Sequence, residues 1–81
     1  MNIKQLVKMA NQIESFFRSE PDRAQAVKDI ASHIQRFWDP RMRKQIIAHI
    51  ADGGEGLGPL AIDAINSLPP ISAKYGQPIA A

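Results

Sequence analysis

Apolar side chains recur at every third or fourth position over much of the chain, with polar residues between them. The first of these stripes consists of Ile3, Leu6, Val7, Ala10, Ile13, Phe16 and Phe17. Because an α-helix completes a turn in about 3.6 residues, this spacing places these side chains on one helix face. We therefore expect a helix over residues 3–18, with Asn2 as its N-cap. Glu14 lies off the stripe and is expected among the solvated residues.

The segment "SEPD", residues 19–22, separates this helix from a second one. Proline cannot continue a helix but suits its first turn, where the missing N–H is no loss. Ser19 and Asp22 have the spacing of a capping box, with Asp in place of the usual Glu or Gln. The second stripe reaches as far as Trp38 and contains Val27, Ile30, Ala31, Ile34 and Phe37.

Asp39-Pro40 is expected to end the second helix, because the residue before a proline is pushed out of the helical conformation. Asp39 is expected to cap a third helix, and its negative charge favours the positive helix end. The third apolar stripe consists of Met42, Ile46, Ile47 and Ile50.

The segment "DGGEGLGP", residues 52–59, ends the third helix, and Gly53 suits the left-handed position after a helix C-terminus. Gly58-Pro59 then opens a short fourth helix, which Pro69-Pro70 stops. Glycine-rich loops also cradle phosphates, but no Lys-Ser/Thr follows this one and Glu55 would repel a phosphate. Phosphate binding is therefore disfavoured.

These elements predict an all-α domain over residues 1–70, a compact bundle of three main helices plus a short fourth helix. Residues 71–81 have no helical period and are expected to form a mobile C-terminal tail, or to order only against a partner.

Composition narrows the chemistry that the chain can perform. The 81 residues include no cysteine, which excludes a disulfide scaffold and a thiolate metal site. No apolar run approaches the roughly 20 residues of a membrane span, and the first residues lack a signal peptide's apolar core; a cytoplasmic location is expected. His33 and His49 belong to different helices, and no nucleophile has a recognisable base beside it. We expect no catalytic residue, cofactor site or metal site.

The stretch "HIQRFWDPRMRKQI", residues 33–46, concentrates aromatic and cationic side chains. Phe37 and Trp38 are consecutive, so they cannot point the same way on one helix; Phe37 is the better core candidate, whereas Trp38 either covers the core or faces a partner. Aromatic residues and arginine dominate interface hot spots. The candidate partner-binding residues are Arg36, Trp38, Arg41, Arg43 and Lys44.

Those cations also permit an alternative, a small helical nucleic-acid-binding protein that contacts phosphates. The formal net charge is only +2, and Asp39 lies inside the cationic cluster. Both facts argue against the nucleic-acid alternative.

Three segments resemble a known family: "MANQIESFF" (9–17), "IASHIQRFWDPRMR" (30–43) and "GGEGLGPLAIDAI" (53–65). They are similar to the delta subunit of the soluble, NAD-dependent, molybdenum-containing formate dehydrogenases. The resemblance covers about residues 3–68. The family often has serine where Gly58 stands, and serine is the better N-cap.

The resemblance implies a non-catalytic accessory subunit of a hetero-oligomer that binds the large catalytic subunit and assists assembly or stability. In such complexes the large subunit holds bis-molybdopterin guanine dinucleotide and iron–sulfur clusters, and other subunits hold FMN and the NAD site. The delta subunit itself holds no cofactor. A transient maturation chaperone for the molybdenum cofactor or the apo large subunit remains an alternative.

Overall fold

The computed structural model describes residues 2–69, and within them the chain forms α-helices and no strand. The helices are α1 (Ile3–Phe17), α2 (Arg23–Phe37), α3 (Pro40–Ala51) and α4 (Pro59–Asn66). The predicted all-α bundle, with three longer helices and a short fourth, is confirmed. The predicted tail, residues 71–81, lies outside the described residues.

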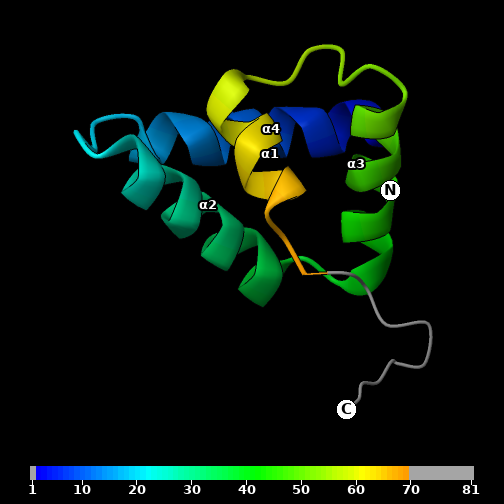
Figure 1. The fold of residues 1–81 in the computed structure, drawn as a ribbon. Helices are drawn as coiled ribbons and strands as arrows, with labels where there is room; N and C mark the ends of the chain where they lie inside the picture. Colours follow the sequence, from blue (N-terminus) through cyan, green and yellow to red (C-terminus); the bar gives the residue numbers. More distant parts are fainter. Residues whose placement is uncertain (1, 70–81) are drawn as a thin grey trace.

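The helices are arranged around α4 (Figure 1). α1 and α2 meet at the short turn between them and diverge toward their other ends, and α3 stands across the open side. α4 packs against all three of the other helices. The core consists of Leu6, Ala10, Ile30, Ile34, Trp38, Ile46, Ala61, Ala64 and Ile65.

The first three helices begin at side-chain caps. The Asn2 side chain accepts a hydrogen bond from the Lys4 N–H at 2.8 Å, and Asp39 accepts from the Met42 N–H at 3.0 Å. Both predicted caps are therefore confirmed. For α2 the cap is Asp22, which accepts from the first-turn amides of the helix. The predicted capping box starting at Ser19 is wrong, because the chain turns helical only after Asp22.

The glycines after α3 close a Schellman motif. Gly53 and Gly54 have φ angles of 118° and 66°, which residues with a side chain rarely adopt. The Gly54 N–H donates to the His49 carbonyl at 2.9 Å, and the Gly53 N–H donates to the Ile50 carbonyl at 3.0 Å. The left-handed residue predicted at Gly53 is confirmed, and this turn sends the chain back toward α1.

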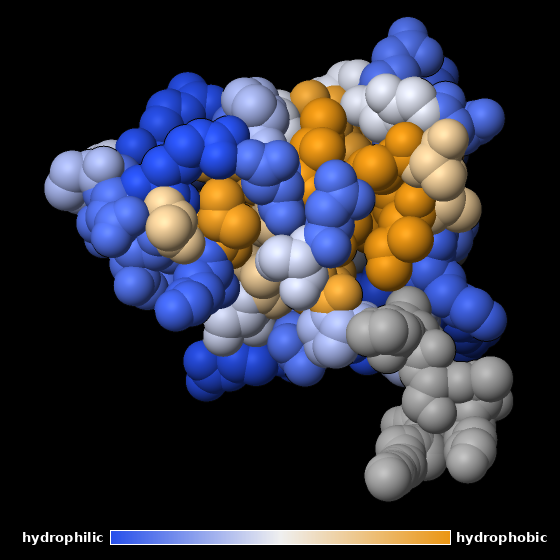
Figure 2. Space-filling model, in the orientation of Figure 1, coloured by the Kyte–Doolittle hydropathy of each residue, from blue (hydrophilic) through white to orange (hydrophobic). Residues whose placement is uncertain are grey.

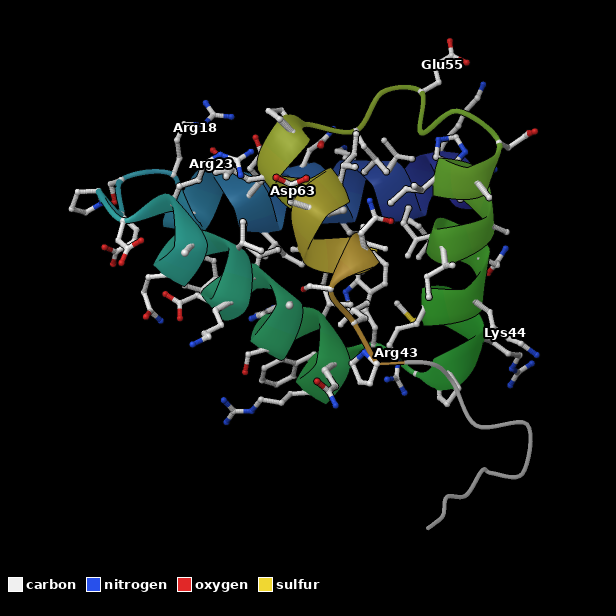
Figure 3. All side chains as sticks on the ribbon, viewed as in Figure 1. Arg18, Arg23, Arg43, Lys44, Glu55 and Asp63 are labelled. Carbon is white, nitrogen blue, oxygen red and sulfur yellow. The ribbon has the colours of Figure 1, made fainter. Side chains whose placement is uncertain are left out.

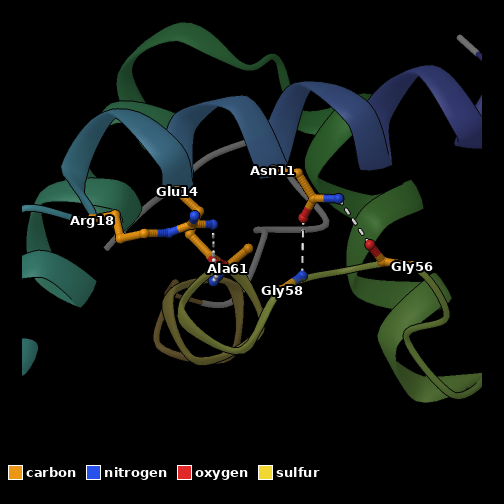
Figure 4. Close-up of polar contacts among 6 residues, drawn as sticks. All are labelled: Asn11, Glu14, Arg18, Gly56, Gly58 and Ala61. Carbon is orange, nitrogen blue, oxygen red and sulfur yellow. Dashed lines mark hydrogen bonds and ion pairs between the residues drawn. The ribbon is translucent and has the colours of Figure 1, made fainter.

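Two side chains of α1 hold the following loop and the start of α4 (Figure 4). The Asn11 amide donates to the Gly56 carbonyl at 2.8 Å, and its oxygen accepts from the Gly58 N–H at 2.9 Å. One oxygen of Glu14 accepts from the Ala61 N–H at 2.8 Å, in the first turn of α4. Glu14 therefore caps a helix that lies 47 positions along the chain.

Glu14 is 4% exposed, so the prediction that it is solvated is wrong. The free N–H groups and positive dipole at a helix N-terminus stabilise a carboxylate there, which offsets the cost of burying the charge. Arg18, one turn later on α1, adds an ion pair at 3.5 Å.

Gly58 is adapted to this cap. Its φ angle is −73°, so the backbone does not require glycine. A Cβ atom at this position would instead collide with the carboxylate of Glu14. A serine here would displace Glu14, but its hydroxyl can cap the same helix from within.

The two consecutive aromatic residues differ sharply in burial, and Phe37 does not take the place predicted for it. Trp38 is 4% exposed and belongs to the core, whereas Phe37 is 68% exposed. α2 ends at Phe37, and Trp38 already has extended dihedral angles, φ −96° and ψ 133°. Its side chain therefore leaves the helical spiral and turns inward. The prediction that Phe37 fills the core is wrong.

We expect Trp38→Ala to lower the free energy of unfolding by about 3–5 kcal/mol, because it removes a buried aromatic side chain. Phe37→Ala is the matched control and should change it by no more than about 0.5 kcal/mol. Urea denaturation followed by circular dichroism measures both. Equal losses for the two variants would contradict the burial described above.

Glu14→Ala should cost about 1–2 kcal/mol, because the Ala61 N–H loses its acceptor. Adding Gly58→Ser to this variant should recover most of the loss, since the space vacated by Glu14 admits a serine cap. Thermal melts of the two single variants and the double variant test this coupling. Glu55→Ala, in the exposed loop, is the control and should leave the melt unchanged.

Candidate partner-binding site

A groove of about 450 Å³ lies between α1 and the C-terminal half of α2, closed at one side by the start of α3. It is lined mainly by Met9, Phe16, Phe17, Phe37, Trp38 and Met42. We call it the aromatic groove, because it holds every phenylalanine and the single tryptophan of the chain.

The aromatic rings form the floor and the rim of this groove. Trp38 is buried and Phe17 is half-buried, whereas Phe16 and Phe37 are 78% and 68% exposed. The Phe16 and Phe17 rings meet edge to face with centroids 5.1 Å apart, and the His33 ring lies 4.7 Å from that of Phe37. The groove therefore presents apolar ring surface to solvent.

The aromatic groove and the α4 contacts use different faces of α1. Successive residues of a helix are rotated by about 100°, which places Gln12 and Phe16 roughly opposite Asn11 and Glu14. Asn11 and Glu14 hold the loop and α4, and Gln12 and Phe16 line the groove. One helix thus carries both the fold's central contact and the candidate site.

The five residues predicted to bind a partner do not share one surface. Trp38 lines the groove, and the Arg36 guanidinium lies 5.9 Å from the Phe37 ring centroid. Arg41 precedes the groove residue Met42 and is exposed.

The other two cations point elsewhere. Arg43 and Lys44 diverge from one another on α3 (Figure 3). Arg43 is half-buried, and its Nε has no hydrogen-bond partner among residues 2–69. Because Arg43 and Lys44 diverge, these two cations do not contribute to one basic face of the kind that contacts phosphates.

A second apolar area lies on the face that carries α4. Figure 2 shows it as a strip between α4 and α3. On the exposed surface toward α2, Arg23 and Asp63 form an ion pair at 2.6 Å. Apolar surface between α3 and α4 is a competing place for a partner to bind.

The glycine-rich loop does not form a phosphate cradle. The amides of Gly53, Gly54, Leu57 and Gly58 all donate to acceptors within the protein. The loop also follows a helix, whereas a nucleotide-binding loop follows a strand.

The two histidines lie apart. His33 lines the aromatic groove, and His49 Nε2 forms a 2.8 Å hydrogen bond with the Glu55 carbonyl. In the described part of the chain no group of three or more His, Cys, Asp or Glu residues is placed to hold a metal ion. None of the described helices is long and apolar enough to cross a membrane.

One protein family matches residues 5–65, well over half of the chain: the delta subunit of NADH-dependent formate dehydrogenase, FdsD. The chain belongs to this family. The resemblance seen in the sequence is confirmed, and the match to the delta subunit family spans the aromatic groove, the Glu14 cap and the loop before α4. No curated protein and no solved structure matches the chain.

Sequence reasoning missed the exposed ring of Phe16, although a signal for it was present. Phe16 and Phe17 are adjacent on one helix, so both cannot enter the same core. The same argument that separated Phe37 from Trp38 therefore applied to the first aromatic pair as well.

Proposed function

We propose that the chain is a non-catalytic accessory subunit of a cytoplasmic, NAD-dependent, molybdenum-containing formate dehydrogenase. It helps assemble or stabilise the complex by binding the large catalytic subunit. Family membership over residues 5–65 is the observation that supports this proposal. The cofactors of the complex, bis-molybdopterin guanine dinucleotide, iron–sulfur clusters, FMN and NAD, would be held by other subunits.

The aromatic groove supports a role in binding. Monomeric proteins rarely leave large aromatic rings gathered at one place in contact with water, and such patches mark interaction sites. Phe16 and Phe37 are both mostly exposed at the same groove.

Co-expression with and without this chain tests the proposal. When the chain is omitted, we expect a several-fold lower yield of assembled formate dehydrogenase, measured as formate-dependent NAD⁺ reduction per milligram of purified catalytic subunit. Activity per bound molybdenum should stay unchanged, because the chain contributes no catalytic group. Full yield and full activity without the chain would overturn the proposal.

The composition of the purified enzyme separates a permanent subunit from a maturation chaperone. A permanent subunit is expected to remain in a fixed ratio with the molybdenum-loaded catalytic subunit, as native mass spectrometry measures. A chaperone would accompany only the cofactor-free catalytic subunit.

A further inference from the structure

We propose that the aromatic groove is the docking site for an amphipathic helix of the catalytic subunit, whose apolar face is flanked by carboxylates. This inference rests on the proposed function and names the surface and the chemistry of its partner. Three observations carry it: the exposure of the rings, the adaptable side chains between them, and the sign of the charges around them.

Because the Phe16 and Phe37 rings are both exposed, covering them requires a partner larger than a small molecule. A small molecule placed in the groove would touch Trp38 and Phe17 but leave the outer faces of Phe16 and Phe37 in water. A helix has a diameter of about 10 Å with its side chains, so it can cover both rims while inserting apolar residues between them.

The groove is suited to a helical partner in particular. Its walls are themselves helices, and the described residues offer no sheet edge to which an extended strand could be added. Met9 and Met42 lie among the aromatic rings. Methionine side chains are unbranched and polarizable, which lets a groove adjust to the side chains of an inserted helix.

The charges around the groove select an acidic partner. The Arg36 guanidinium lies 5.9 Å from the Phe37 ring centroid. Arg41 is exposed in the first turn of α3, the helix whose Met42 lines the groove. Lys8 is exposed one turn before Gln12 on α1. No carboxylate, lysine or arginine lines the groove itself. The nearby carboxylates already have partners: Asp29, in the neighbouring hollow, accepts a hydrogen bond from the Gln25 amide at 2.8 Å, and Asp39 accepts one from the Met42 N–H at 3.0 Å. Acidic side chains beside the partner's apolar face would meet these cations and fix its position.

The same positive charges disfavour two other molecules or segments that could cover the groove: a second copy of this chain and its own segment of residues 70–81. A second copy of this chain would bring its own Arg36 and Arg41 toward cations of the same sign. The segment of residues 70–81 carries Lys74 as its only charged side chain, so it has no acidic side chain to offer these cations.

The test compares binding of full-length variants to the purified catalytic subunit, by biolayer interferometry. Phe16→Gln combined with Phe37→Gln should weaken binding at least ten-fold, because both rim contacts are lost. Both side chains are exposed, so the thermal melt should not change. Ile47→Gln is the matched control: Ile47 is 37% exposed and lies five positions after Met42, on a different face of α3. It should bind as the unaltered chain does.

A second variant pair tests the charges separately. Arg36→Glu combined with Arg41→Glu should also weaken binding at least ten-fold and remove most of its dependence on salt. Overlapping synthetic peptides that cover the catalytic subunit should yield a binder that is acidic, amphipathic and helical when bound.

The outcomes separate this inference from the proposed function. If the unaltered chain does not bind the catalytic subunit, both fail. If it binds and the Phe16/Phe37 variant binds equally well, or if Ile47→Gln alone loses binding, the groove is not the site and only this inference fails. A basic or non-helical peptide in the groove would overturn it too. The same holds for a homodimer, seen by sedimentation, that the Phe16/Phe37 variant abolishes.

Discussion

The carboxylate of Glu14 at the first turn of α4 is the contact on which the arrangement of this small domain depends. α4 has only eight residues, begins at Pro59, and its N-cap residue Gly58 has no side chain to cap it. A helix this short is not stable in isolation. Its position therefore depends on α1, which caps it through Glu14 and ties down the preceding loop through Asn11. Because α4 packs against every other helix, a contact at one of its ends helps to order the whole bundle.

The aromatic groove follows from the same geometry. α1 and α2 diverge from their connecting turn, and α4 contacts both of them from the side that Asn11 and Glu14 face (Figure 1). Within residues 2–69 there is no fifth helix to cover the opposite side of α1, where Phe16 lies. A domain with so few elements can bury one core but cannot cover both sides of a diverging helix pair. The uncovered side is where the exposed rings gather.

What the sequence predicted well was local, and what it missed was tertiary. The helices, the Asn2 and Asp39 caps and the left-handed Gly53 each depend on neighbours within one or two turns, and all were predicted. Glu14 was misplaced because its partner lies far along the chain, so no local pattern reveals the cap. Phe37 was misplaced, and Trp38 left undecided, because α2 ends one residue before the apolar stripe does. Trp38 has extended backbone angles, so its side chain does not point where the helical spacing would place it. The groove was missed for a related reason: whether Phe16 and Phe37 are exposed depends on whether another helix packs over them, which no local pattern reveals.

Trp38 connects the fold to the site, since it belongs to the core and also lines the groove. A partner that covers the groove binds the folded chain and not the unfolded one, so it must stabilise the fold by mass action. By thermodynamic linkage the effect is reciprocal: a contact that holds Trp38 in its buried position also raises the affinity for the partner. In the proposed docking, the stability of the domain and its affinity for the partner are therefore coupled through one buried side chain. A core substitution at Trp38 would weaken binding without removing an exposed contact, whereas Phe16 and Phe37 report on binding alone.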